Sequence, residues 1–119
     1  MNEAQVEEIS PAEAKRLRDA GKAVIIDVRE PHEYQAERIH GALLFPLSTF
    51  DARSVPDDGE KRVIFHCGAG KRSLMAAQQC LQSGRPAVAH ITGGLGAWKQ
   101  DGLPTVSVDP STGQVVDNG

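Results

Sequence analysis

The sequence has few cysteines and no long apolar run, and both absences exclude classes of protein. Only Cys67 and Cys80 occur among 119 residues. They are too few for a disulfide framework and, with only four scattered histidines, too few for a zinc site. No stretch of about 18 apolar residues and no signal-peptide pattern is present, so we expect no membrane segment. A cytoplasmic, reducing setting fits this composition best.

The chain also lacks any run of lysine or arginine. Its 13 basic and 16 acidic residues give a formal net charge of −3, which argues against nucleic acid as the main partner. Apolar residues make up 39% of the sequence, an ordinary fraction for a protein with a packed core. A chain of this length is long enough for one domain with a modest core and too short for two.

The most informative stretch joins an apolar run to a helical pattern. Residues 63–66 predict a buried strand, and Ser73–Leu81 predicts a helix that begins almost at once. The short loop between them starts with Cys67 and ends with Lys71 and Arg72. Such a junction points successive backbone N–H groups into one concavity, where the helix N-terminus adds partial positive charge. The sequence therefore predicts a cradle for an anion.

A thiolate is itself an anion, so Cys67 in this cradle is expected to ionise more easily than a free cysteine. The helix terminus and the two cations all favour the charged sulfur. We interpret Cys67 as a nucleophile. The alternative is a structural cysteine buried at a strand end, the usual fate of a lone intracellular cysteine.

The rest of the chain alternates strands with helices. Strands are expected at Gln5–Ile9, Ala23–Val28, Ala42–Phe45 and Ala87–Ile91, and helices at Pro11–Ala20, Pro31–Glu37, Pro46–Ala52 and around Trp98. Ser10 is the expected N-cap of the first helix, with Glu13 completing a capping box. A turn is expected at residues 57–59. Strand, helix and strand in this order indicate an α/β protein with a doubly wound parallel sheet.

Three stretches together resemble the rhodanese (sulfurtransferase) domains. They are the loop Cys67–Ser73, the early run Asp27–Tyr34 with Ile39–Ala42, and the late run Gly93–Trp98. The resemblance covers about residues 6–104. It implies a three-layer α/β fold, a five-stranded, mainly parallel sheet with helices on both faces. It also divides the chain into a rhodanese-like domain at 1–104 and a C-terminal tail at 105–119.

The spacing within the loop favours one chemistry of the resembled superfamily. Four residues, 68–71, separate Cys67 from Arg72, whereas cysteine-dependent phosphatases place five residues between nucleophile and arginine. In the superfamily the shorter loop goes with sulfur transfer and the longer one with phosphate or arsenate. The resemblance thus implies a persulfide on Cys67, loaded from thiosulfate or a persulfide donor and unloaded onto cyanide or a thiol, with no metal or organic cofactor. A protein donor or acceptor is a further partner that it allows.

The same resemblance assigns roles along the loop. The catalytic residue is Cys67, and the anion is held by the loop residues Gly68, Ala69, Gly70, Lys71, Arg72 and Ser73. For Lys71, a solvated loop lysine is an equal alternative. Asp27, Arg29 and Trp98 are expected to support the site, the first two by tying a strand end to nearby loops. His66 points away from Cys67 because neighbouring strand residues face opposite sides.

Several features remain open from the residues alone. His32 and His90 belong to no motif and are expected to be ordinary. Cys80 lies about 10 Å along the helix from Ser73 and is expected to be a small buried residue, with a resolving thiol as the alternative. The tail is a small hairpin, a mobile end or a linker to a missing segment. Two other functions stay open: a carrier or nitrosylation-sensing module loaded by a partner, and a small phosphatase or arsenate reductase.

Overall fold

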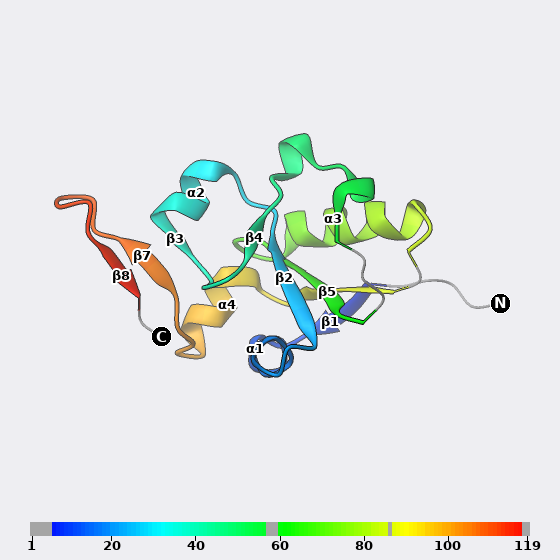
Figure 1. Ribbon diagram of the computed structural model, residues 1–119, viewed down its shortest axis with the longest axis horizontal. Coiled ribbons are helices and arrows are strands. Elements are labelled where there is room, and N and C mark those ends of the chain that lie inside the picture. Colours follow the sequence, from blue (N-terminus) through cyan, green and yellow to red (C-terminus); the bar gives the residue numbers. More distant parts are fainter. Residues whose placement is uncertain (1–5, 57–59, 86, 118–119) are drawn as a thin grey trace.

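The structure, a computed structural model, describes residues 6–56, 60–85 and 87–117. Its centre is a sheet of five parallel strands in the order β1-β6-β5-β2-β4. The strands are β1 (Val6–Ile9), β2 (Ala23–Asp27), β4 (Leu43–Leu44), β5 (Arg62–His66) and β6 (Val88–Ile91). The middle position of the sheet belongs to β5, the strand that leads into the predicted cradle (Figure 1). The predicted α/β fold with a five-stranded sheet is confirmed.

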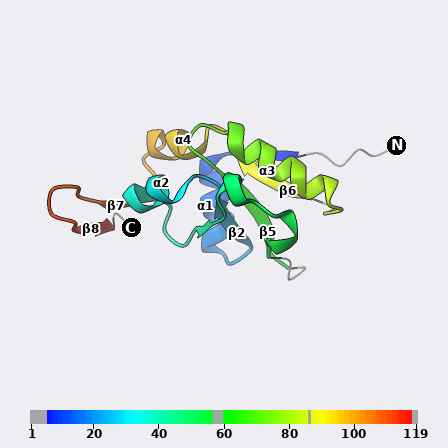
Figure 2. The same cartoon turned by 90° about the horizontal axis from the view of Figure 1, so that it is seen from above.

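In β2 and β5, apolar residues point to both faces of the sheet, because both faces are covered. Ile25 and Ile64 are buried on one face with α1 (Pro11–Asp19) and α4 (Gly94–Gln100). Ile26 and Phe65 are buried on the other face with α3 (Lys71–Gln82). Figure 1 shows these helices on opposite sides of the sheet, and Figure 2 shows α3 running beside β6.

The first helix begins where the sequence predicts. The Ser10 side chain accepts a hydrogen bond of 3.2 Å from the backbone N–H of Glu13, and Pro11 occupies the first turn. The reciprocal half of the capping box is not formed, because the Glu13 carboxylate pairs with Arg16 instead, at 2.8 Å from Nε. An ion pair one turn along the helix thus competes with the backbone for the same carboxylate.

The region after Pro46 differs from the expected helix. It contains two short 3-10 turns, η1 (Leu47–Thr49) and η2 (Ala52–Ser54), separated by extended backbone at Phe50. Extension at Phe50 places its ring against Phe65 in an edge-to-face contact, with ring centroids 5.7 Å apart. Packing against the core therefore interrupts the helix that the local pattern favours. The turn expected at 57–59 lies outside the described residues.

A second, three-stranded sheet joins the C-terminal tail to the early part of the chain. Its strands are antiparallel, in the order β3 (Glu37–Arg38), β7 (Val106–Val108) and β8 (Val115–Asp117). The hairpin β7–β8 projects from the main sheet at the left of Figure 1. The tail, for which the sequence left three alternatives, therefore forms a hairpin over its described residues, and the pairing with β3 has no counterpart in the sequence pattern.

The remaining helix, α2 (Pro31–Ala36), follows β2 and leads directly into β3. It is a short helix with no fully buried residue, but the side chains of Glu33 and Tyr34 form hydrogen bonds with residues outside it. Within the described residues, no helix is long and apolar enough to cross a membrane.

Candidate active site around Cys67

Cys67 lies directly after β5, at the carboxyl edge of the sheet, where ligands bind in open α/β folds. Only 1% of the residue is exposed. The loop turns at Gly70, whose φ of 108° lies in the left-handed region, and α3 begins at Lys71. Because this turn is tight, the first N–H groups of α3 come back toward the cysteine sulfur.

Hydrogen-bond donors surround the sulfur of Cys67. The backbone N–H of Gly70 donates to Sγ at 3.1 Å, and that of Ser73 donates at 3.3 Å. The Ser73 hydroxyl lies 3.6 Å from Sγ. Gly70 and Ser73, two of the loop residues predicted to hold an anion, thus donate to the sulfur itself, so a thiolate at Cys67 is an anion that these donors stabilise.

These contacts lower the pKa of Cys67. Burial acts in the opposite direction and raises the pKa, but the hydrogen bond from the Ser73 hydroxyl and those from the N–H groups of Ser73, Gly70 and Ala69 together outweigh it. Hydrogen bonds that a charged group accepts favour its charged form. The thiolate is therefore stabilised by groups that the loop holds in place before any substrate arrives.

The Arg72 side chain forms an ion pair with a residue that the sequence analysis did not assign to the site. Its guanidinium donates to both carboxylate oxygens of Glu33 on α2, from Nη1 at 2.7 Å and from Nη2 at 3.0 Å. This pairing lowers the pKa of Glu33 to about 2, chiefly through the hydrogen bonds from Arg72. It also holds the guanidinium beside the loop, where a Cβ placed on Gly68 would lie 3.4 Å from Nη2.

The other predicted loop residues differ in exposure. Ala69 and Lys71 are exposed, while Gly68 is partly covered. Lys71 makes no ion pair with another residue of the described part of the chain. The loop therefore offers one fixed cation, Arg72, and one free cation on its outer side.

Asp27 and Arg29 form a buried ion pair at the end of β2. The Arg29 guanidinium donates to the Asp27 carboxylate, with Nη2 and Oδ2 2.8 Å apart, and also to the backbone carbonyl of Glu37 at 2.6 Å. The His66 ring lies 3.3 Å from the same carboxylate. Burial alone would raise the pKa of Asp27. The contacts with His66 and Arg29 outweigh burial, so the pKa of Asp27 lies well below its usual range. This cluster ties β2, β5 and the start of β3 together and does not reach the Cys67 sulfur.

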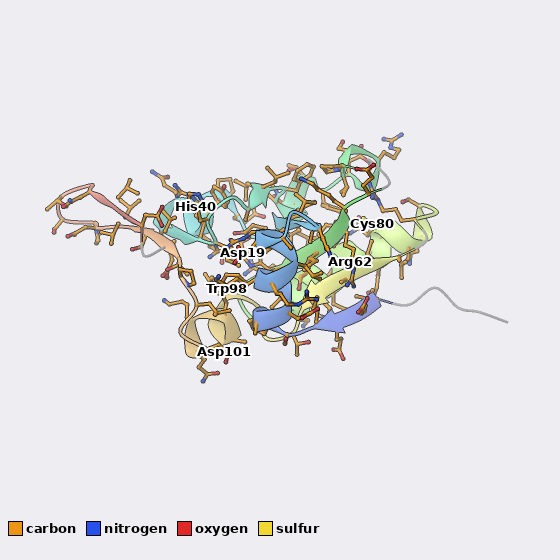
Figure 3. The ribbon with its side chains drawn as sticks, turned by 60° about the horizontal axis from the view of Figure 1, so that its bottom comes forward. Asp19, His40, Arg62, Cys80, Trp98 and Asp101 are labelled. Carbon is orange, nitrogen blue, oxygen red and sulfur yellow. The ribbon has the colours of Figure 1, made fainter. Side chains whose placement is uncertain are left out.

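Trp98 is also placed away from the Cys67 sulfur. Its side chain is fully buried where α1 and α4 meet (Figure 3), and its indole N–H donates to the Pro104 carbonyl at 2.9 Å. The part of α4 that touches the loop is backbone. The N–H of Leu95 donates to the Cys67 carbonyl at 2.7 Å, and the N–H of Gly96 donates to the Gly68 carbonyl at 3.1 Å.

The pKa of the second cysteine, Cys80, is shifted in the opposite direction. Cys80 lies on α3 (Figure 3) and is fully buried among apolar residues. Burial raises the pKa of its thiol, only partly offset by the charge of Arg85. A neutral, enclosed thiol is a poor nucleophile. No contact between Cys80 and the Cys67 sulfur is present among the hydrogen bonds of the described residues, so its position favours the structural interpretation.

Two residues at the site had no role in the sequence analysis. Glu33 lies within the early run Asp27–Tyr34, but nothing in that run indicates that it meets Arg72, 39 residues away. His90 was expected to be ordinary, yet its Nδ1 lies 3.0 Å from the Ser73 hydroxyl oxygen. The local signal for His90 is weak, because only the sheet order places β6 next to β5. Among the described residues, no group of three or more His, Cys, Asp or Glu side chains is arranged to hold a metal.

Comparison with known proteins places these features in a family. The model of the rhodanese-like domain matches residues 10–101. A sulfurtransferase of Allochromatium vinosum is 31% identical over 107 residues, which are 90% of this chain and 96% of that protein. An uncharacterised protein of Synechocystis is 39% identical over 98 residues, 82% of this chain, and this match spans 55% of its length. A thiosulfate sulfurtransferase structure from Pseudomonas aeruginosa superposes with a TM-score of 0.70 at 28% identity, covering 96% of this chain and 21% of that one.

Proposed function

Because the chain belongs to the rhodanese-like domain family, we propose that it is a sulfurtransferase that carries a sulfane sulfur on Cys67. The donor is thiosulfate or a persulfide, and the acceptor is cyanide or a thiol. The observation that carries the proposal is the set of donors around Sγ: two backbone N–H groups within 3.3 Å and the Ser73 hydroxyl at 3.6 Å. A sulfur so surrounded is prepared to be an anionic nucleophile.

The first half-reaction loads the cysteine. The Cys67 thiolate attacks the outer sulfur of thiosulfate, a bond forms between Sγ and that sulfur, and the sulfur–sulfur bond of the donor breaks. Sulfite leaves with the electron pair, and the protein holds a persulfide. The small exposed fraction of Cys67 favours a donor with a slender terminal sulfur, as thiosulfate and persulfides have.

The second half-reaction empties the cysteine. Cyanide or a thiolate attacks the outer sulfur, and the bond between the two sulfurs breaks. Thiocyanate or a new persulfide leaves, and the Cys67 thiolate returns. Because the thiolate is the leaving group in this step, the hydrogen bonds that lower its pKa assist both halves of the cycle.

The donor's negative charge is met by Arg72 in this proposal. A guanidinium has five N–H donors, and the pair with Glu33 uses one on each terminal nitrogen. The remaining donors are available to a sulfonate while Glu33 keeps the plane of the group fixed. Lys71 adds a second, exposed positive charge that attracts an anionic donor toward the loop.

The test is the intact mass of the protein after incubation with thiosulfate. We expect the parent to gain one sulfur, about 32 Da, and to lose it on addition of cyanide, because the persulfide is the proposed intermediate. Cys67→Ser is expected to gain nothing. Cys80→Ser is the matched control, since it removes the other thiol and leaves the loop unchanged, and it is expected to gain the same mass as the parent.

Two other results would replace this proposal. If the parent gains no sulfur while Cys67 still reacts rapidly with an alkylating agent, a module loaded by a protein partner becomes the better explanation. If the protein releases phosphate from an aryl phosphate, and Cys67→Ser loses that activity, the protein is a phosphatase.

The physiological setting is part of the same proposal. The matched segment spans 55% of the length of the Synechocystis relative. We propose a cytoplasmic location, where thiol acceptors are abundant. A protein donor or acceptor would dock at the exposed loop around Ala69 and Lys71.

A further inference from the structure

The Ser73 hydroxyl lies at the centre of a small, largely buried polar network. Its oxygen lies 3.6 Å from the Cys67 sulfur, 3.0 Å from Nδ1 of His90 and 3.2 Å from the carbonyl oxygen of Gly70. Ser73 is fully buried and His90 is 4% exposed. A hydroxyl has one proton to donate and two lone pairs, so it cannot serve all three neighbours as a donor.

The tautomer of His90 decides where that proton goes. Burial lowers the pKa of His90, which keeps the imidazole neutral, with one N–H and one lone pair. If the proton is on Nε2, Nδ1 must accept, and it takes the only proton that Ser73 has. If the proton is on Nδ1, His90 donates to the serine oxygen, and the hydroxyl proton remains available for another acceptor.

The surroundings of the ring favour the second arrangement. Nε2 is buried and has no hydrogen-bond partner among the described residues. Oε1 of the Glu8 carboxylate on β1 lies 3.8 Å from Nε2, beyond hydrogen-bond distance, and the Glu8 side chain is largely exposed to solvent. On the other side, β5 presents Phe65 in register with His90, and α3 presents Ser73. An N–H on Nε2 would be a buried donor without an acceptor, which proteins avoid more strongly than a buried lone pair.

We propose that His90 is a positioning residue: its Nδ1–H donates to the Ser73 oxygen and leaves the hydroxyl proton free to bind the Cys67 sulfur. While the cysteine is a thiol, the serine oxygen accepts from both Sγ–H and Nδ1–H, and its own proton goes to the Gly70 carbonyl. When the sulfur becomes an anion, the hydroxyl rotates and donates to Sγ. No proton leaves His90 in either state.

This proposal rests on the proposed role of Cys67 as a nucleophile, but its test does not require sulfur transfer. The readout is the rate at which iodoacetamide alkylates Cys67 as a function of pH. We expect His90→Phe to alkylate about two- to tenfold more slowly on the acid side of the profile and to move the inflection to higher pH, since one hydrogen bond supporting the thiolate is weakened.

A double-mutant cycle separates this role from simple packing. In the Ser73→Ala background, His90→Phe is expected to have no further effect, because the hydroxyl through which it acts is gone. An equal loss of rate in both backgrounds would overturn the proposal. Val88→Ala is the matched control: Val88 is also buried on the α3 side of β6, and its substitution is expected to leave the pH profile unchanged.

A second measurement keeps the proposal testable if His90→Phe does not fold. Nitrogen chemical shifts of the His90 ring in the parent protein report which nitrogen carries the proton. We expect the Nδ1–H tautomer at pH 7, whereas the Nε2–H tautomer would show that Ser73 gives its proton to the imidazole and would refute the proposal. His90→Asn, which restores an N–H donor, is expected to recover much of the alkylation rate.

Discussion

Gly94 is the position where one added methyl group tests how the loop is held. It is the first residue of α4, and its φ of +58° lies in the left-handed region. A Cβ at this position would lie 2.2 Å from the Cys67 carbonyl oxygen and 2.9 Å from the carbonyl carbons of Cys67 and Gly68. All three are backbone atoms, so no side-chain rotation relieves the contact.

The expected cost of Gly94→Ala follows from these distances. The methyl group must move about 1 Å away from the loop to reach an ordinary contact distance. That shift weakens the hydrogen bonds that Leu95 and Gly96 donate to the loop carbonyls, each with a net contribution of about 0.5–1.5 kcal/mol. Overpacking adds about 1–3 kcal/mol and the left-handed backbone about 1–2 kcal/mol.

Gly102→Ala is the matched control for the backbone contribution. Gly102 has a φ of +73° just after the same helix, but a Cβ there would have nothing within 4 Å. Gly102→Ala is expected to lose only the stability that the left-handed backbone costs, about 1–2 kcal/mol. We therefore expect the free energy of unfolding of Gly94→Ala to fall about 2–5 kcal/mol below that of Gly102→Ala, as measured by urea denaturation.

The loop displacement should also appear in the chemistry. A misplacement of about 1 Å at a reacting group costs on the order of 100-fold in rate, so Gly94→Ala is expected to transfer sulfur about 100-fold more slowly than Gly102→Ala. Equal stability and equal rates in the two variants would refute the reasoning, because they would mean that the close approach of α4 does not fix the loop.

Three further predictions follow from the charges and thiols of the site. The hydrogen bonds from Arg72 lower the pKa of Glu33 from its usual 4.5 to about 2, so the unfolded chain binds more protons between these values, and the stability that this group contributes is lost as pH falls through that window. Glu33→Gln is expected to lower the free energy of unfolding by about 1 kcal/mol at pH 7 and to reduce the difference between the pH 7 and pH 3 urea midpoints; an unchanged difference would count against the ion pair with Arg72. Alkylation of the folded parent at pH 7 should label Cys67 and spare Cys80, as mapped by peptide mass, because hydrogen bonds lower the pKa of Cys67 while burial raises that of Cys80; labelling of both at similar rates would contradict this difference. Asp27→Asn is expected to destabilise the fold by about 3–5 kcal/mol in thermal or urea unfolding, because the buried Arg29 guanidinium loses its counter-charge, and a loss below about 1 kcal/mol would show that the pair is replaceable.

Local patterns were sufficient for the elements that form the cradle. The apolar run of β5, the glycines of the loop and the helix that follows are contiguous in sequence, so the convergence of N–H groups near Cys67 was predictable from spacing. The succession of strands and helices along the chain followed from the alternation of apolar runs with capped helices. Where packing acted on a single residue, as at Phe50, the local pattern predicted the wrong structure.

The roles of Asp27, Arg29 and Trp98 show the limit of motif recognition. All three lie in stretches that identify the family, yet the structure places them in buried contacts rather than around the sulfur. A motif marks residues that a fold needs, and it does not separate those that touch a substrate from those that hold the chain in place. Their contribution to activity remains a prediction that substitution must test.

The sequence by itself determined the α/β fold and the resemblance to the family, and it led us to propose Cys67 as the nucleophile, because local runs of residues carry each of these signals. The tertiary structure alone decided which residues from distant parts of the chain meet the loop. Glu33 reaches Arg72 across 39 residues, and His90 reaches Ser73 across 17. The contact of His90 exists because β6 lies beside β5, and the order of strands within the sheet is set by packing of the whole core rather than by any local periodicity.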